Sequence, residues 1–266
     1  LTTQDANSDT SKMIQYIESS VTAGEDAIII NMVDPETAAQ CIEAAGDVPV
    51  VFVNRFPGDP SVLNEKAVYV GSDEMTSGAF QGEFLAKFFK DQGKTDISYL
   101  MLNGILGQTS TTNRTASVLK ALEDNGIKAT AAAAPLAADY DRATAMDMIS
   151  PLLKTTKYDC IISNNDAMAL GAVEAMQQQG LDPKSVPIVG IDATADGRQA
   201  IKDGTLAMTV FQNAEGQGRA SLQAAANLID GKPIAEGTGY EVDDENEFII
   251  WVPFEPVTVD NVADYD

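Results

Sequence analysis

Short, mostly apolar runs alternate along this chain with stretches that are apolar on one side only. The apolar runs lie at 26–34, 48–54, 67–73, 97–104, 158–163, 186–192 and 206–212. Between them apolar residues recur every three or four positions, as in Met13, Ile17 and Val21, which is the spacing of one helix face. Buried strands alternating with helices predict parallel sheets covered by helices on both faces.

Residues at the ends of the predicted helices support this interpretation. Asp34 followed by Pro35 is a favourable helix start. Gly126 and Gly180 follow two other predicted helices, where glycine commonly ends the last turn. A further helix is predicted at about 214–230, and residues 239–253 read as a β-hairpin or as paired strands around a polar turn.

The number of elements predicts two α/β domains, because it exceeds what one compact doubly wound domain holds. The length of 266 residues is sufficient for two modest cores. Cys41 and Cys160 are the only cysteines, and each lies in an apolar segment. We expect them to be buried thiols in different domains rather than a disulfide.

Composition excludes several classes of function. The net charge of -23, from 40 acidic and 17 basic residues, repels nucleic acid. The chain has no histidine, which rules out Ser-His-Asp and Cys-His catalysis and ordinary zinc sites. It also lacks a phosphate-binding loop and a dinucleotide fingerprint, and residues 5–9 match a calcium loop only at its start.

Polar side chains follow the predicted strands, where open parallel sheets bind ligands. They are Asn54, Gln108, Ser110, Arg114, Asn165, Asp192 and Gln212. Amides, carboxylates and a guanidinium suit a ligand with many hydroxyl groups. Tyr140 offers an aromatic face for the apolar side of a sugar ring.

Each of these residues also has a simpler interpretation. Asn and Asp after strands often serve as caps and turn formers, and we expect Asp166 to cap its helix. Arg114 is also compatible with a helix surface. Their joint occurrence at successive strand ends is what favours a ligand site.

Several segments, in this order, resemble the periplasmic sugar-binding proteins of the galactose/glucose and ribose type: INMVDP, VPVVFVN, YVGSD, SNNDAMALGAVEAM, VGID and GTLAMTV. The resemblance implies an α/β fold of two Rossmann-like lobes with parallel sheets joined by a hinge, the type I periplasmic binding protein fold. The expected lobes are 1–70 with 214–249, and 72–212 with 252–266.

The resemblance also implies which residues bind the ligand. Asn54, Arg114, Asn165 and Asp192 match sugar ligands of the family, Tyr140 matches a stacking aromatic, and Gln212 a polar ligand position. Gln108 and Ser110 stand where the galactose/glucose branch has His and Asp, so the resemblance does not identify the sugar. The calcium loop of that branch has no counterpart here, and we expect no metal.

The family begins with a strand and a helix that this sequence does not contain. The resemblance places that strand between the ones we predict at 1–4 and 26–33. An empty slot would leave buried backbone groups unpaired. We therefore expect a further portion of the protein, or another chain, to fill it.

By this resemblance the protein binds a monosaccharide between its lobes and delivers it to the membrane permease of an ABC importer. It is expected to be an extracytoplasmic monomer without a cofactor, to bind no nucleic acid and not to be an enzyme. The alternatives are the effector domain of a LacI-type repressor, a chemotaxis or kinase sensor, and an enzyme using Asp192 with Asp166. The sequence does not distinguish transport from sensing.

Overall fold

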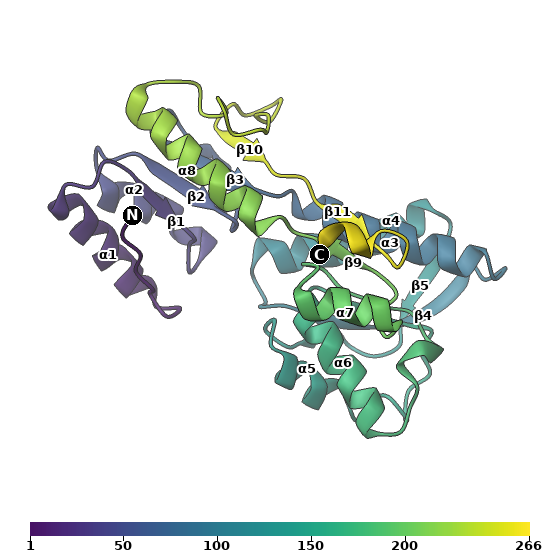
Figure 1. The fold of residues 1–266 in the computed structure, drawn as a ribbon. Helices are drawn as coiled ribbons and strands as arrows, with labels where there is room; N and C mark the ends of the chain where they lie inside the picture. Colours follow the sequence, from purple (N-terminus) through teal and green to yellow (C-terminus); the bar gives the residue numbers. More distant parts are fainter. The chain divides into compact units, whose positions relative to one another are not determined.

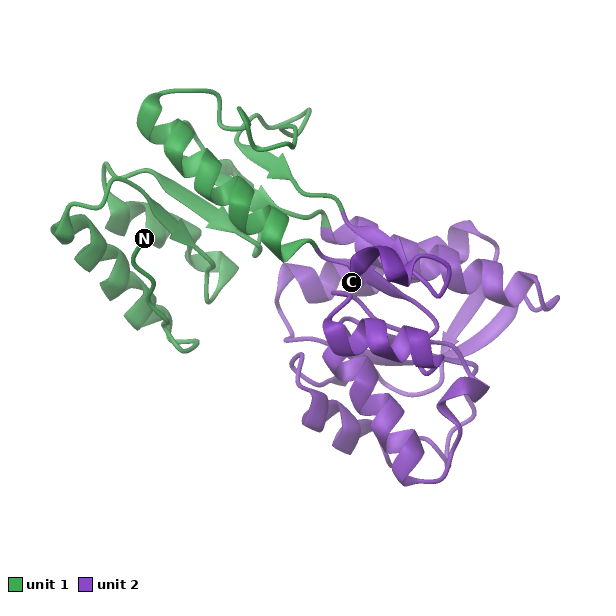
Figure 2. Cartoon of the chain, viewed as in Figure 1, with its two compact units in different colours: residues 1–73, 213–253 green, residues 74–212, 254–266 purple.

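The computed structural model describes residues 1–266 and divides them into two compact units (Figure 2). Unit 1 comprises Leu1–Asp73 and Asn213–Pro253, and unit 2 comprises Glu74–Gln212 and Phe254–Asp266. The chain therefore passes from one unit to the other three times. No helix in the chain has the length and apolar character needed to span a membrane.

Unit 1 is built on a four-stranded parallel sheet. The strands are β1 (Ile28–Ile30), β2 (Val50–Val53), β3 (Ala67–Gly71) and β10 (Ile249–Trp251), in the order β1-β2-β3-β10. Successive residues of a strand point to opposite faces, so Phe52 packs with α1 (Thr10–Ala23) and α2 (Ala38–Ala45). Its neighbour Val51 packs with α8 (Ala214–Asp230) on the other face (Figure 1).

Unit 2 repeats this arrangement around a second parallel sheet. Its order is β5 (Lys128–Ala131), β4 (Asp96–Asn103), β7 (Cys160–Ser163) and β8 (Ile188–Val189), and the short β6 (Leu136–Ala137) also pairs with β4. An antiparallel pair, β9 (Thr209–Phe211) with β11 (Glu255–Val257), completes the strands.

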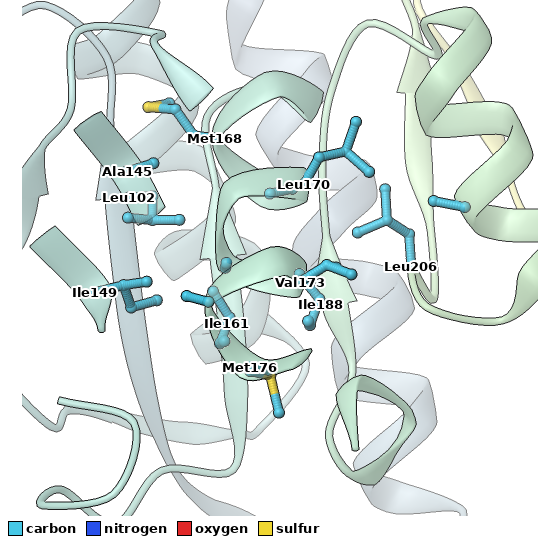
Figure 3. Close-up of a cluster of buried hydrophobic side chains, with 14 of the residues drawn as sticks. Leu102, Ala145, Ile149, Ile161, Met168, Leu170, Val173, Met176, Ile188 and Leu206 are labelled. Carbon is cyan, nitrogen blue, oxygen red and sulfur yellow. The ribbon is translucent and has the colours of Figure 1, made fainter. Parts of the chain in front are cut away.

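Helices cover both faces of this second sheet. One face packs against α3 (Glu74–Lys90) and α4 (Thr109–Asp124). The other packs against α5 (Arg142–Ile149), α6 (Asp166–Gln178) and α7 (Ala195–Asp203). Figure 3 shows the core on that second side, where Val173 and Met176 of α6 lie beside Ile161 and Ile188 of the sheet. The predicted α/β class with parallel sheets is confirmed.

Most predicted elements form, with caps where the sequence indicates them. The Asp34 side chain accepts a hydrogen bond from the Glu36 N–H at 3.0 Å and starts a 3-10 turn that leads into α2. Short 3-10 helices lie at Pro35–Thr37, Pro60–Val62, Pro183–Ser185 and Val262–Tyr265. Cys41 and Cys160 are buried free thiols, one in each unit, as predicted.

Two strand predictions need correction. Residues 1–4 are exposed and form no strand. They make no ladder bonds to β1, which lies at an edge of its sheet and pairs with β2. The predicted pairing within 239–253 is reduced to one antiparallel bridge between Val242 and Ile250. The main partner of β10 is instead β3, in parallel register, since a long apolar strand in the sheet interior offers more bonds than a polar loop.

Candidate functional site

The carboxyl ends of β4, β7 and β8 lie at one edge of the unit 2 sheet, because these strands are parallel neighbours. Gly104 follows β4, Asn164 follows β7, and a turn at 191–194 lies just beyond β8. The Gly104 N–H donates to Asn164 Oδ1 at 3.1 Å, which ties the first two strand ends together. The site is built on this edge.

Arg114 lies at the centre of the edge, on α4, and only 5% of it is exposed. Its Nε and Nη2 donate to the two carboxylate oxygens of Glu74 at 2.6 and 3.0 Å, and its Nη1 donates to the Asn164 carbonyl at 2.7 Å. Burial acts to lower the pKa of Arg114, but the charges of Glu74 and Asp192 outweigh it and raise that pKa above its ordinary value. Arg114 is therefore a fixed positive charge.

Asp192 faces this charge from the turn after β8. Its Oδ1 lies 3.8 Å from Arg114 Nη1, and its side chain keeps 28% exposure, against 6% for Arg114. Partial burial raises the pKa of Asp192 to about 7, and the nearby charges of Asp166 and Glu74 add to the rise against that of Arg114. Asp192 is thus the accessible acceptor of the cluster.

Tyr140 closes the other side of the β4 end. Its hydroxyl lies 2.9 Å from Ser110 Oγ and 2.8 Å from Thr111 Oγ1, both on the first turn of α4. The hydroxyl end of its ring lies against Gly104, where an added Cβ would come within 2.0 Å of the ring. The hydroxyls of Ser110 and Tyr140 therefore hold each other in place.

Asn165 follows Asn164 in the sequence and is 8% exposed. Its Oδ1 accepts from the Met168 N–H at 3.0 Å and caps α6, while its Nδ2 donates to the Tyr140 carbonyl at 3.4 Å. The prediction that Asp166 caps this helix is wrong. Asn165 has the extended backbone of a cap residue, whereas Asp166 is already the first helical residue.

The remaining predicted residues are Gln108 and Gln212 of unit 2 and Asn54 of unit 1. Gln108 occupies the N-cap position of α4, but its side chain makes no cap bond. The Gln212 N–H donates to the Asp192 carbonyl at 3.4 Å, which places it next to the turn. Asn54 belongs to unit 1, where it follows β2 with a φ of +66° and its carbonyl accepts from the Tyr69 hydroxyl at 2.8 Å.

The structure therefore brings Ser110, Arg114, Tyr140, Asn165 and Asp192 together on one edge of unit 2, and adds Glu74 and Thr111, which sequence reasoning missed. Both left a signal. Glu74 directly follows the YVGSD strand end. Thr111 precedes Arg114 by three residues, so on a helix it shares the inward face.

This arrangement offers fixed hydrogen-bond donors and acceptors rather than a reactive pair. The oxygens and nitrogens of Glu74, Asn164 and Arg114 are held by one another, and Asp192 remains accessible beside them. Within residues 1–266, no group of three or more carboxylates and thiols is placed to hold a metal ion. The edge is suited to binding a polar ligand.

Known proteins are similar to this chain over most of its length. The family model of the periplasmic binding protein domain matches residues 1–233. The D-galactose/methyl-galactoside binding periplasmic protein of Haemophilus influenzae is 37% identical over 257 residues, which cover 91% of this chain and 75% of that protein. A putative rhizopine-binding protein of Rhizobium meliloti is 33% identical over 265 residues, and the match covers 98% of this chain and 81% of that protein.

Solved structures share the fold over nearly the whole chain. An ABC transporter solute binding protein from Bacillus halodurans, solved with bound myo-inositol, superposes with a TM-score of 0.79 at 30% identity. The match covers 98% of this chain and 84% of that one. The chain therefore belongs to the periplasmic binding protein family, among the sugar-binding proteins of the galactose/glucose and ribose type.

Proposed function

We propose that this protein binds a monosaccharide or a similar cyclic polyol and delivers it to the membrane permease of an ABC importer. The observation that carries the proposal is the buried Arg114, fixed by Glu74 and Asn164 with the more exposed Asp192 carboxylate beside it. A carboxylate accepts from two hydroxyl groups at once, and a guanidinium donates in a planar fork. Adjacent hydroxyls on a sugar ring present the matching groups.

The relatives support the ligand class. One is named for galactose and its methyl glycoside, and the Bacillus halodurans structure contains myo-inositol. All three ligands contain a six-membered ring that carries several hydroxyl groups. We propose that Gln108, Ser110, Tyr140, Asn165 and Gln212 complete the unit 2 contacts and that Asn54 contributes from unit 1.

The proposal extends to the behaviour of the whole protein. The three passages between the units, after Asp73, Gln212 and Pro253, are the proposed hinge. We propose that the protein works as an extracytoplasmic monomer that hands its ligand to the permease unchanged. The family is one of binding proteins, which supports a role without turnover.

A thermal-unfolding panel tests the binding step. We expect one sugar or inositol among D-galactose, D-glucose, D-ribose, D-allose and myo-inositol to raise the melting temperature. At a hundredfold excess over Kd the added stability is about 2.7 kcal/mol. The shift is expected to disappear in Asp192→Ala and to persist in Asp147→Ala, which removes an exposed carboxylate of the same unit.

The outcomes are distinct. If no polyol shifts the wild-type protein, or if Asp192→Ala responds as the wild type does, the proposed site is wrong. Chromatography of the recovered ligand checks the absence of turnover, because an enzyme would return an altered compound.

A further inference from the structure

We infer that Asp166 is a positioning residue that holds the 191–194 turn and thereby places the Asp192 carboxylate beside Arg114. The role in ligand affinity rests on the proposed function. The role in the turn rests on the contacts of Asp166 alone and is tested separately.

The turn adopts a backbone conformation that needs external support. Asp192 has a φ of +114° and Ala193 a φ of +49°. Residues other than glycine rarely adopt such positive φ values. Such residues persist only where surrounding contacts determine them.

Asp166 supplies three of them from a fully buried position. Its Oδ2 accepts from the Thr194 N–H at 2.8 Å and from Thr194 Oγ1 at 3.1 Å. Its Oδ1 accepts from Thr209 Oγ1 at 2.6 Å, and the Asp166 N–H donates to the Ile191 carbonyl at 2.7 Å. The side chain therefore joins the start of α6 to the Thr194 end of the turn and to β9, while the backbone N–H holds the Ile191 end.

Thr209 extends this support to the middle of the turn. Its hydroxyl donates to Asp166 and accepts from the Ala193 N–H at 3.2 Å. The direction of this chain of bonds is fixed, because an ionised carboxylate only accepts. An amide in place of the carboxylate would set an N–H donor against at least one of the groups that now donate to it.

The surrounding backbone leaves room for this carboxylate. A Cβ at Gly190 would lie 2.3 Å from Asp166 Oδ1, and a Cβ at Gly197 would lie 2.1 Å from Oδ2. Glycine at these two positions lets the carboxylate reach the turn. Asp166 is fully buried, so its influence on a ligand acts through Asp192.

The test compares two pairs of substitutions. Asp166→Asn and Thr209→Val remove the support, whereas Asp196→Asn changes an exposed carboxylate near the same turn and Thr209→Ser keeps the hydroxyl. Circular dichroism first establishes that each variant is folded. Hydrogen exchange over 190–198 is then measured without ligand, followed by calorimetry with the polyol that the panel identifies.

We expect faster exchange over 190–198 in Asp166→Asn and Thr209→Val, with exchange in unit 1 unchanged. The affinity of Asp166→Asn should fall by about tenfold, since bonds to a charged group are lost, while Asp196→Asn and Thr209→Ser bind as the wild type does. If Asp166→Asn does not fold, Thr209→Val provides the same readouts.

Lower stability with unchanged local exchange and unchanged affinity would mean a merely structural role and would overturn the inference. If the wild-type protein binds no polyol, the proposed function fails, and the exchange measurement still decides whether Asp166 holds the turn.

Discussion

At the scale of single residues, Arg114 shows how a charge is kept inside a protein. A buried charge is costly unless it is both paired and hydrogen-bonded. Three different nitrogens of Arg114 donate, two to Glu74 and one to the Asn164 carbonyl. Glu74 therefore offsets much of the free-energy cost of burying the Arg114 guanidinium.

Glu74→Gln is expected to be strongly destabilising, because it leaves the Arg114 charge buried without its bidentate partner. Breaking a buried pair in this way costs about 3–5 kcal/mol in the free energy of unfolding. Urea denaturation measures the loss. Glu83→Gln is the matched control, since Glu83 is an exposed carboxylate of the same helix and should change stability by less than about 0.5 kcal/mol. Equal losses in both variants would contradict this account.

Sequence reasoning predicted much of the candidate site, because polar side chains gather at the ends of parallel strands. It could not decide between neighbouring acceptors. Asn165 and Asp166 are both good caps, and only the backbone shows that Asn165 caps α6 while Asp166 turns toward Thr194 and Thr209. It also could not pair Glu74 with Arg114, because 40 residues of sequence separate them.

At the scale of elements, α3 and α4 approach closely along a line of small residues. A Cβ at Gly78 would lie 2.3 Å from the Arg114 carbonyl oxygen, and one at Gly82 would lie 2.6 Å from the Val118 carbonyl oxygen. The close approach brings Glu74, on the first turn of α3, within reach of Arg114 on α4.

Two glycine substitutions separate helix propensity from packing. Gly82→Ala gains propensity but forces α3 away from α4, and we expect it to lower the free energy of unfolding by about 1–3 kcal/mol. Gly218→Ala, inside α8, meets nothing within 4 Å and should raise stability by up to about 1 kcal/mol. Thermal and urea unfolding measure both changes. A rise in the stability of Gly82→Ala like that expected of Gly218→Ala would show that packing at Gly82 does not limit the approach.

Elements with strong apolar periodicity or clear caps were predictable from sequence, and weakly patterned ones were not. The sequence predicts a helix at about 214–230, and α8 lies at Ala214–Asp230. The sequence pattern predicts neither β5 nor α5. The strand β5 is mostly exposed and reads KATA, and α5 buries only Ala145 and Ile149, so neither carries a continuous apolar signal.

At the scale of the whole molecule, alternation of strand and helix predicted the class, and the structure shows why each unit is a separate core. Each parallel sheet has its own two apolar layers, formed by different helices. The chain returns to unit 1 for α8 and β10 only after completing most of unit 2. Sequence periodicity does not predict these crossings between the units, because the crossings depend on contacts between segments that are distant in the sequence.

The two cysteines have a consequence at this scale. Cys41 lies in the core of unit 1 and Cys160 in the core of unit 2, both with 0% exposure. Burial raises the pKa of each thiol, so little reactive thiolate forms. In the native protein both should resist alkylation, and each should react only when its own unit opens.

Pulsed iodoacetamide labelling along a urea gradient, read by peptide mass spectrometry, is expected to give one unfolding curve per cysteine. Cys41→Ala and Cys160→Ala variants confirm the assignment of each curve, and rapid labelling of either thiol in native buffer would contradict the expectation. Each unit thus contains one native thiol whose labelling reports when that unit opens. The opening of one unit can therefore be compared in time with that of the other, with and without ligand, and no dye or engineered label is needed.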